Sequence, residues 1–570
     1  MADELPEYHD VVVIGAGVAG LRCASQLMKA QGVTDVLVVE ASGRVGGRVM
    51  NDTSFIPGMS IEVGAEFMHG ANTTLTRLAE EHHIGTREIF TWAQVRTQCQ
   101  SMHDISRASD VASFGRPFAR LRAFGGTVLV SLSLVRAHPG EVSLDSYIPQ
   151  KVDNMHAVAI EESVQPYSRF HVGLLLDQGD GGPTEPAPDG GIGYYYVGDQ
   201  KRMLKYDDDD EEFLKFNLSV ADLSDLENID QIPPEKSMRD YFNEVGLSAS
   251  MMKLCEAGYA NTAGGPLEDI SMRTTCRYEK QWIELEDEGD FRVVPSFMRF
   301  VDLFAEGVTT RLNWPVASVD YSQSDRILVT STSGKQLSCR TLVVTVSTAV
   351  FSKIVYTPVI PQEKVAAVKS FDMRRAGKVL LHMSSRFWPV DAHGVICSDC
   401  FLPEFWFNSS KGIGHLKPNG DKLCVETPSS EPETEDAAES DKVQYLITGY
   451  AGALYAESFV GVDRGKIIES FLDQLDMIYG TVDEPKPAHK HFVRGMYKDW
   501  GDEPWIGGGY AFPRVGQSDT ASQDLAAPVD GRIFFAGEAT AFEQPGMSVH
   551  AAIDTGTRAS TQVVRALQEQ

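Results

Sequence analysis

The sequence predicts an α/β protein. Two observations carry this prediction. Near the amino end, four β-branched residues at 11–14 lead into a glycine-rich turn and a helical pattern, which is the order of a βα unit. From about residue 84 to residue 288 this order is absent, and helical and strand patterns are mixed.

The glycine-rich turn has the pattern of a dinucleotide-binding site. Gly15 permits the tight turn, Gly17 lets the backbone approach a pyrophosphate, and Gly20 lets the next helix lie close to the strand. The first N–H groups of that helix, including that of Ala19, are expected to face the phosphates. The turn therefore predicts a Rossmann-like domain.

A carboxylate stands where this motif needs one. The apolar run at 33–39 predicts a second strand, which ends at Glu40, 20 residues after Gly20. An acid here accepts hydrogen bonds from ribose hydroxyls and disfavours a 2′-phosphate. A glycine turn without a ligand also occurs in α/β proteins, but the strand, the helix and the acid together favour dinucleotide binding.

Composition restricts the partners. The net charge is −29, from 80 acidic and 51 basic residues; such a field repels nucleic acid and attracts cations, although a merely solubilising acidic surface explains it equally well. No apolar run is long enough to span a bilayer, and the acidic start MADELPEYHD is unlike a signal peptide. We expect a cytoplasmic protein without membrane or nucleic-acid partners; the oligomeric state is left open.

The number and spacing of the cysteines and histidines do not match a metal site, so no metal is expected. Eight cysteines in 570 residues are too few for a disulfide scaffold. Cys397 and Cys400 are the only close pair, and zinc would need a second pair that Cys424 alone does not supply. We interpret them as two ordinary thiols, and His489 and His491 as a pair without further ligands.

Beyond Glu40 the sequence resembles the flavin-containing amine oxidase family. The family's FAD segment reads E, three residues, R, one residue, GGR, and here Arg44, Gly46, Gly47 and Arg48 follow the acid in that order. The resemblance implies the two-domain flavin amine oxidase fold, a discontinuous Rossmann-like FAD domain plus an α+β substrate domain. Its parts are expected at 1–85, 290–360 and 496–570 for FAD, and at 86–289 and 361–495 for the substrate.

The resemblance implies further FAD contacts. The segment IEVGAEFMHG at 61–70 resembles the family strand that passes the flavin ring, with Phe67 in place of the usual Trp. The carboxyl segment FAGEAT…MSVHAAIDTGTRAS resembles the family's closing motif, with Ala551 in place of Gly and Met547-Ser548 in place of Gly-Thr. The expected cofactor residues in these and neighbouring segments are Gly64, Ala65, Glu66, Val316, Gly537, Glu538, Ser548 and Val549.

The resemblance also implies the chemistry. The segment KVLLHMSSRFWP matches a family pattern whose lysine lies near flavin N5, so Lys378 is expected to be catalytic; a strand-end lysine in solvent is the other interpretation. Tyr510 matches one aromatic wall of the substrate site. Gly509 stands where monoamine oxidases carry their flavin-linking cysteine, so noncovalent FAD is expected.

The expected reaction is oxidation of an amine, with a polyamine preferred, by hydride transfer to flavin N5. The imine product hydrolyses, and dioxygen is reduced to hydrogen peroxide. Glu66 and His69 are expected to hold a second substrate nitrogen, although His69 is equally well explained as a packed histidine of its strand.

Four alternatives use related scaffolds. A desaturase or protoporphyrinogen-type oxidase is disfavoured by Lys378 and the segment at 64–70. A nicotinamide-dependent flavin reductase would need a second nucleotide fingerprint, which GIGYYYVG does not supply. A histone lysine demethylase relative with a long helical hairpin would show sustained heptads, and none occurs. A specialised monoamine or secondary-metabolite amine oxidase stays open.

Overall fold

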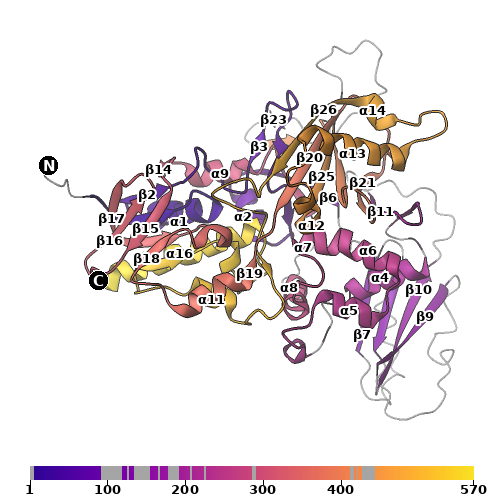
Figure 1. Cartoon of the computed structure of the whole chain (residues 1–570), viewed down its shortest axis with the longest axis horizontal. Coiled ribbons are helices and arrows are strands. Elements are labelled where there is room, and N and C mark those ends of the chain that lie inside the picture. Colours follow the sequence, from indigo (N-terminus) through magenta and orange to yellow (C-terminus); the bar gives the residue numbers. More distant parts are fainter. Residues whose placement is uncertain are drawn as a thin grey trace.

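The computed structural model describes residues 6–90, 192–284, 290–410 and 443–569, apart from short gaps at 206–207, 209, 222, 224–225 and 227, together with six strands within 118–176 and 416–425. Two lobes lie side by side along the long axis (Figure 1), and both termini are at the end that carries β1, β2 and β17. The sequence predicts a surface loop at 177–193, rich in glycine and proline, and a low-complexity loop at 426–442. Most of the first and all of the second lie outside the described residues.

The lobe with the termini is built on an eight-stranded sheet. Its strand order is β14-β2-β1-β17-β16-β15-β18, with β28 paired to β17. β1 runs parallel to both β2 and β17, as a βαβ unit requires. The strands are β1 (Glu7–Ile14), β2 (Val36–Val39), β14 (Thr309–Arg311), β15 (Val316–Asp320), β16 (Ile327–Ser331), β17 (Gln336–Val344), β18 (Val355–Thr357) and β28 (Ile533–Phe535).

Helices cover both faces of this sheet, which explains the unbroken apolar run in β1. Val11 and Val13 pack in one core with α1, α9 and α16, whereas Val12 and Ile14 pack in a second core with α10, α11 and α15. A central strand buried on both sides needs apolar residues at successive positions. These helices are α1 (Val18–Lys29), α9 (Met298–Ala305), α10 (Thr348–Phe351), α11 (Gln362–Ser370), α15 (Ala521–Ala526) and α16 (Val549–Glu569).

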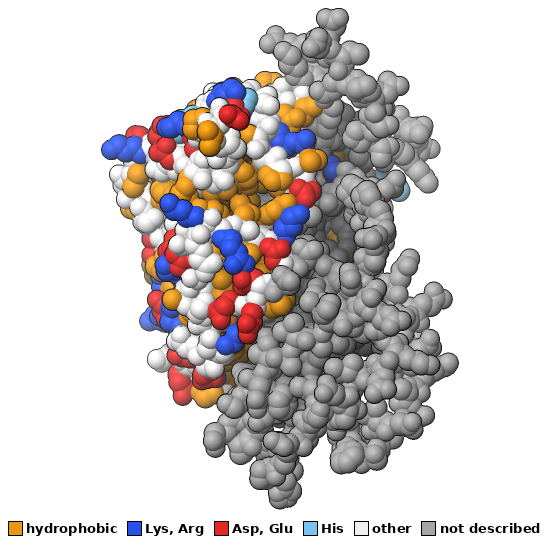
Figure 2. Space-filling model, turned by 90° about the vertical axis from the view of Figure 1, so that its right-hand side faces the viewer, with side chains coloured by type: hydrophobic (Ala, Val, Ile, Leu, Met, Phe, Trp, Pro, Cys, Tyr) orange, Lys and Arg blue, Asp and Glu red, His pale blue; other side chains and the backbone are white. Residues whose placement is uncertain are grey.

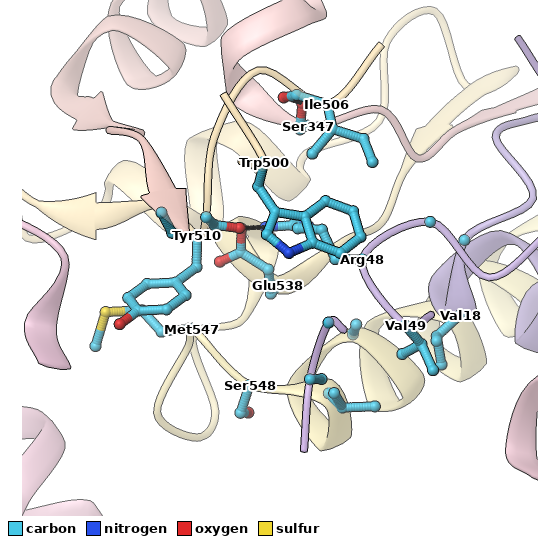
Figure 3. A pocket seen from close by; sticks show the side chains of 18 of the residues that line it. Val18, Arg48, Val49, Ser347, Trp500, Ile506, Tyr510, Glu538, Met547 and Ser548 are labelled. Carbon is cyan, nitrogen blue, oxygen red and sulfur yellow. Dashed lines mark hydrogen bonds and ion pairs between the residues drawn. The ribbon is translucent and has the colours of Figure 1, made fainter. Parts of the chain in front are cut away.

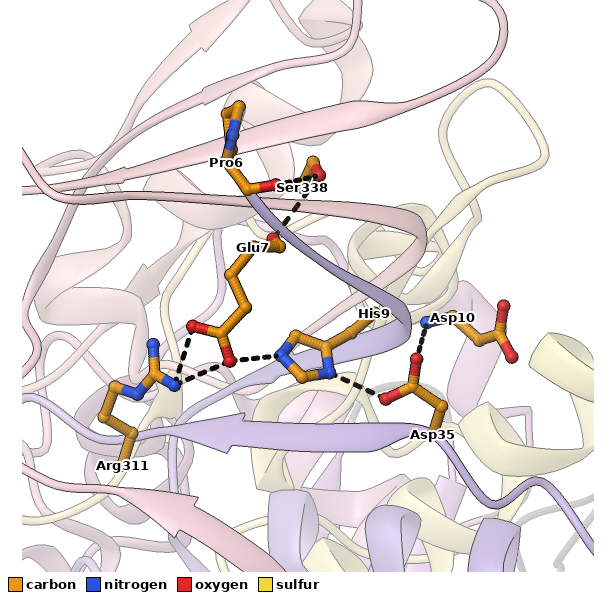
Figure 4. Close-up of polar contacts among 7 residues, drawn as sticks. All are labelled: Pro6, Glu7, His9, Asp10, Asp35, Arg311 and Ser338. Atoms are coloured by element: carbon orange, nitrogen blue, oxygen red, sulfur yellow. Dashed lines mark hydrogen bonds and ion pairs between the residues drawn. The ribbon is translucent and has the colours of Figure 1, made fainter. Parts of the chain in front are cut away.

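A polar network ties the amino end of β1 to its neighbours (Figure 4). His9 bonds Asp35, which precedes β2, over 2.7 Å, and Arg311 of β14 donates to the Glu7 carboxylate over 3.0 Å. Ser338 of β17 donates to the Glu7 carbonyl. The strand register is therefore held by side chains as well as by the backbone ladder.

The second lobe is built on a seven-stranded sheet. Its strand order is β12-β11-β21-β22-β25-β20-β26. One face packs under α13, where Val379, Leu381 and Phe405 are buried in a common core; the other face looks toward the first lobe. The strands are β11 (Ile192–Val197), β12 (Arg202–Lys205), β20 (Ala376–Met383), β21 (Ala392–Cys397), β22 (Glu404–Ser409), β25 (Tyr445–Gly452) and β26 (Phe492–Asp499).

Smaller elements complete this lobe and the junction. β5 (Phe67–His69), β13 (Asp290–Val294) and β6 (Gly85–Phe90) form a three-stranded sheet between the lobes. A four-stranded sheet comprises β7 (Phe118–Phe124), β8 (Thr127–Ser133), β9 (Met155–Val164) and β10 (Tyr167–Leu176). The short strand pairs are β3 (Asn51–Asp52) with β4 (Ile61–Glu62), β19 (Phe371–Asp372) with β27 (Phe512–Pro513), and β23 (Leu416–Asn419) with β24 (Lys422–Val425).

The remaining helices belong mainly to the second lobe. In the described part of the chain, none has the length and apolar character of a membrane span. They are α2 (Thr74–Glu81), η4 (Ile229–Gln231), α4 (Glu211–Ala221), α5 (Met238–Val245), α6 (Ala249–Cys255), η5 (Glu256–Ala260), α7 (Asn261–Ala263), α8 (Met272–Glu284), α12 (Ala453–Ser458), α13 (Arg464–Tyr479), α14 (Pro487–His491) and η7 (Glu538–Thr540).

Two expected domain boundaries separate residues that pack together in the structure. The eight-stranded sheet's second core extends past residue 360, because Ala367 and Phe371 are buried in it. The seven-stranded sheet extends past residue 495, because β26 ends at Asp499. The acidic run at 207–212 has the composition of a solvated turn, but it ends in helix α4, whose Phe213 N–H donates to Asp210 over 3.0 Å. An acid at a helix N-terminus accepts such free N–H groups.

The visible face of the second lobe is not a single acidic surface. In Figure 2, acidic and basic side chains are interspersed over the described part of this face, and apolar side chains gather in its upper part. Charges of both signs are therefore mixed on the described part of this face.

Gly20→Ala is expected to destabilise the first lobe. A Cβ at Gly20 would lie 2.0 Å from the Gly15 carbonyl oxygen, so the helix would have to move away from the turn. Overpacking of this kind costs about 1–3 kcal/mol in free energy of unfolding, measurable by urea denaturation. Gly17→Ala is the matched control, because its Cβ would approach nothing closer than 3.9 Å; equal stability of the two variants would contradict the prediction.

Candidate active site

A cavity of about 1280 Å³ lies between the two lobes. It runs from the glycine turn after β1 to the side chains that β20, β22 and β25 present to it from the second lobe. Sites for drug-sized ligands occupy about 300–1,000 Å³, so this central cavity has room for a dinucleotide and a further small molecule.

The three glycines of the turn have different surroundings. Gly15 has φ +106°, where a side chain is strained, and its Cβ would also meet the Thr345 hydroxyl at 2.6 Å. Gly17 has φ −71° and is open toward the central cavity, its nearest neighbour being Gly47 Cα at 3.9 Å. Gly15 and Gly20 thus serve the fold, whereas Gly17 leaves space beside the helix N-terminus, at which Val18 and Ala19 also line the cavity.

Glu40 and Arg44 organise the loop after β2. One Glu40 oxygen accepts from the Ala16 N–H over 2.8 Å, and the other accepts from the Ser42 N–H and hydroxyl. Arg44 donates to the Gly47 carbonyl oxygen over 2.7 Å. Both residues line the cavity, as does Val316 at the start of β15.

Arg48 and Glu538 meet across the cavity wall (Figure 3). The Arg48 guanidinium donates to Glu538 Oε1 over 2.9 Å and to the Gly509 carbonyl over 3.0 Å. The Glu538 side chain is buried, yet its Oε2 has no partner. A buried carboxylate oxygen without a donor is costly, and the hydroxyls of a ribityl chain would satisfy it, so the residues fit FAD.

The carboxyl-terminal helix begins at the cavity. The Ser548 hydroxyl accepts from the Ala551 N–H over 3.2 Å, which caps α16. Met547 has φ +60° and lines the cavity, as does Val549 at the start of the helix. Gly64 and Ala65 also line the cavity; a Cβ at Gly64 would lie 2.0 Å from the Arg48 carbonyl oxygen.

Lys378 and Glu66 form a buried ion pair in the cavity wall. Lys378 Nζ donates to Glu66 Oε2 over 2.8 Å and to the Glu62 carbonyl over 3.2 Å. Arg292 of β13 lies 3.0 Å from Glu66 Oε1. Burial would raise the pKa of Glu66, but Lys378 and then Arg292 outweigh it and hold that pKa below its ordinary value, so the carboxylate stays charged.

Two donors from β22 complete the shell around Glu66. Trp406 Nε1 donates over 2.9 Å and Asn408 Nδ2 over 3.2 Å, both to Glu66 Oε1. Side chains two apart on a strand share a face, so Glu404, Trp406 and Asn408 all point away from the α13 core.

Aromatic side chains line the second-lobe end of the cavity. The Tyr510 hydroxyl bonds that of Tyr450 over 3.0 Å and donates to the Thr262 carbonyl. Phe67 and Trp406 are in edge contact with centroids 5.1 Å apart, and Trp500 also lines the wall.

Acidic groups lie at the same end. Glu404 faces the cavity and accepts from Asn261 Nδ2 over 3.2 Å; burial raises the pKa of Glu404 to about 7. His69, half exposed, bonds Asp290 over 2.6 Å, and both line the cavity.

The sequence interpretation missed Arg292, Glu404, Trp406 and Tyr450. They lie on β13, β22 and β25, which carry no recognised motif. The alternation in EFWFN at 404–408 was the available signal, because it predicts a strand with one polar face. It does not say what that face meets.

The structure is that of a two-domain FAD-dependent oxidoreductase. It combines a Rossmann-like sheet, a glycine turn open to a long cavity, and a second lobe with aromatic and acidic walls. The chain belongs to the family of flavin containing amine oxidoreductases, whose family model matches residues 18–125 and 208–564. The fold class and the FAD cofactor expected from the sequence are thereby confirmed.

Relatives within the family differ in function. Lysine-specific histone demethylase 2 of Homo sapiens is 25% identical over 98% of this chain and 54% of its own length. Polyamine oxidase 3 of Oryza sativa subsp. japonica is 23% identical over 96% of this chain and 88% of its own. The chain thus spans about half the length of this demethylase.

Solved structures match over nearly the whole chain. Putrescine oxidase with bound putrescine aligns with a TM-score of 0.64 at 17% identity, over 98% of this chain and 99% of that one. Cyclohexylamine oxidase from Brevibacterium oxydans aligns with a TM-score of 0.65 at 17% identity, with the same coverage of both chains. At this identity the likeness supports the fold.

Proposed function

We propose that the chain oxidises a di- or polycationic amine to an imine, which hydrolyses, while dioxygen is reduced to hydrogen peroxide. The observation that carries this proposal is the second-lobe end of the central cavity, where Glu404 faces aromatic walls from Tyr450, Tyr510 and Trp406. Aromatic faces attract cations, and a carboxylate beside them suits a second, charged nitrogen.

FAD is the electron acceptor when bound, and the chain's residues hold and align it. The Gly17 side of the turn and the α1 N-terminus suit the pyrophosphate. Glu40 suits a ribose, Val316 the adenine half, and Glu538 the ribityl chain. The α16 N-terminus, capped by Ser548, presents a positive dipole end to the ring region.

The substrate end favours the reactive, neutral form of one amine nitrogen. Burial disfavours a charged group, so an ammonium entering this aromatic region has a lowered pKa and loses its proton more readily. Glu404 can hold a distal ammonium of the same molecule, because its carboxylate faces the cavity. One nitrogen is thus deprotonated while another anchors the substrate.

We assign Lys378 to the reacting end and Glu66 to its support. The two oxygens of Glu66 are engaged by Lys378, Arg292, Trp406 and Asn408, which leaves little capacity for a substrate ammonium. Glu66 is therefore proposed as a positioning residue for Lys378, in place of the substrate-binding role expected from the sequence. Lys378 supplies a fixed positive charge and N–H donors at the cavity wall.

His69 and Asp290 are proposed to line the substrate entrance. Their pair is partly exposed, with 52% of the His69 side chain and 24% of the Asp290 side chain accessible. A polycation approaching the cavity meets this acid before it reaches Glu404.

A second candidate substrate is an N-methylated lysine side chain of a protein. It is favoured by the similarity to lysine-specific histone demethylase 2, which covers 98% of this chain. The bond chemistry is the same, but a methylated lysine offers one nitrogen and the long chain of a protein behind it. A specialised monoamine oxidase or desaturase on the same scaffold is the remaining alternative.

A peroxide-release assay distinguishes these substrates. The purified holoenzyme is incubated with spermine, spermidine, N-acetylated polyamines, an aryl monoamine and a dimethyl-lysine peptide. The proposal expects the highest kcat/KM with an unacetylated polyamine. A higher value with the peptide would favour the second candidate, and a higher value with the monoamine would reject the polyamine assignment.

The KM for a polyamine is expected to fall as pH rises through about 7, because the folded-state pKa of Glu404 is raised to about 7. Glu404 is mostly neutral below that pH and charged above it. Glu404→Gln should remove this inflection and raise KM for spermine about tenfold or more, with little change for a monoamine. Steady-state kinetics between pH 5.5 and 8.5 measure both effects.

Glu306→Gln is the control, because Glu306 is exposed and pairs with Lys29 in the first lobe. Its pH profile should match that of the parent. An inflection retained in Glu404→Gln would remove Glu404 from substrate binding.

A further inference from the structure

Two cysteines of the second lobe lie at the two ends of one turn. Cys397 ends β21, residues 398 and 399 form the turn, and Cys400 follows. The ends of a four-residue turn lie within about 7 Å, and a disulfide needs a Cα separation of about 4.4–6.8 Å. The backbone therefore already provides the spacing of a disulfide.

The two thiols have unequal surroundings. Cys397 is fully buried in the α13 core, whereas Cys400 is partly exposed. A hydrogen bond from the Cys397 thiol holds the pKa of Cys400 below its ordinary value, while burial raises the pKa of Cys397 well above it. Such a pair has one accessible, nucleophilic sulfur and one resolving thiol beside it.

The turn is held in this shape from both sides. The Ser398 N–H donates to the Tyr196 carbonyl of β11 over 3.0 Å, and Lys253 of α6 pairs with Asp399 over 2.7 Å. Asp399 has φ +53°, which a turn of this kind requires at its third residue. These contacts fix the turn and therefore hold the two cysteines at its ends.

The position of the turn relates it to the central cavity. β21 and β22, which the turn region connects, line that cavity through Ile396 and Glu404. Neither cysteine lines the cavity, but under the proposed function the hydrogen peroxide released from it supplies the oxidant.

We infer that Cys397 and Cys400 are a dithiol that hydrogen peroxide oxidises to a disulfide. The Cys400 thiolate attacks one peroxide oxygen, the O–O bond breaks, and the departing hydroxide takes up a proton to leave as water. The Cys397 sulfur then attacks the resulting sulfenic acid, forming the S–S bond, and its proton leaves with the hydroxyl as a second water. Two thiols lose two electrons, and one peroxide becomes two waters.

The oxidant in this inference rests on the proposed function, and the test separates the two. The FAD-loaded full chain is treated with added hydrogen peroxide, quenched in acid, alkylated under denaturing conditions and mapped by mass spectrometry. We expect a 397–400 peptide with an internal disulfide that dithiothreitol reduces. The buried Cys23, Cys255, Cys276 and Cys339 should be recovered as alkylated thiols. Both cysteines alkylated after treatment, or Cys400 oxidised beyond sulfenic acid without a cross-link, would overturn the inference.

Variants sharpen the result. Cys397→Ser should trap a sulfenic acid at Cys400 that reacts with dimedone, and Cys400→Ser should leave Cys397 reduced. Cys276→Ser is the control and should still form the cross-link. If Cys397→Ser is unstable, the time course of cross-linking in the parent tests the inference instead. An unreactive pair would be recovered with both thiols alkylated at every time point.

A second arm uses turnover in place of added peroxide. The holoenzyme is supplied with amine and dioxygen, with and without catalase. Cross-linking without catalase and its suppression with catalase would support both proposals. Cross-linking with added peroxide but no peroxide release from any amine would reject the proposed function and leave the dithiol standing.

Discussion

Gly17→Val is expected to give a folded, colourless protein that retains no FAD and releases no peroxide. The backbone at Gly17 has φ −71°, which valine adopts without strain, and no protein atom lies within 3.9 Å of the added Cβ. The valine methyl groups would instead fill the space of the cavity that the pyrophosphate occupies in this fold. Flavin absorbance of the purified protein and circular dichroism measure the two parts of the prediction.

Gly43→Ala is the matched control in the adjoining loop. Gly43 does not line the cavity, and its Cβ would come no closer than 3.4 Å to Asn313. The control should purify yellow and active. A yellow, active Gly17→Val protein would mean that the pyrophosphate does not lie against this turn.

Lys378→Met is expected to slow reoxidation of the reduced enzyme by dioxygen about 100-fold, with a much smaller effect on reduction by amine. Methionine keeps the length of the side chain but removes the positive charge and the N–H donors at the cavity wall. Glu66 retains Arg292, Trp406 and Asn408 as partners, so the fold should persist. Stopped-flow measurement of each half-reaction tests this directly.

Lys498→Met provides the comparison, since Lys498 lies opposite Lys378 in the ladder between β20 and β26 and pairs with Glu503 outside the Glu66 cluster. Its oxidative rate should equal that of the parent. Equal rates for parent and Lys378→Met would exclude the lysine from oxygen chemistry.

The local motifs were predictable because neighbouring residues determine them. The turn at 15–20 follows from glycine positions and flanking strand and helix patterns, and the structure has β1, α1 and β2 in that order. Glu40 was predictable for the same reason, because it directly follows the last residue of β2. A resemblance at both ends of the chain was sufficient for the family and for FAD.

The domain boundaries were less predictable, for a packing reason. Residues 361–371 carry an ordinary helical pattern, and only their burial against the second core of the eight-stranded sheet assigns them to the first lobe. β26 likewise joins the seven-stranded sheet by pairing with β20. Neither partner is visible in the local sequence.

By itself, the sequence determined the nucleotide end of the site, since a phosphate-binding turn is made by consecutive residues whose backbone angles depend on their immediate neighbours. Only the tertiary structure decided the substrate end. Glu66 and Lys378 are 312 residues apart, and Arg292 and Trp406 reach the same carboxylate from two further strands. Which charges meet depends on how the sheets pack, because a buried ion is stable only where its partners converge.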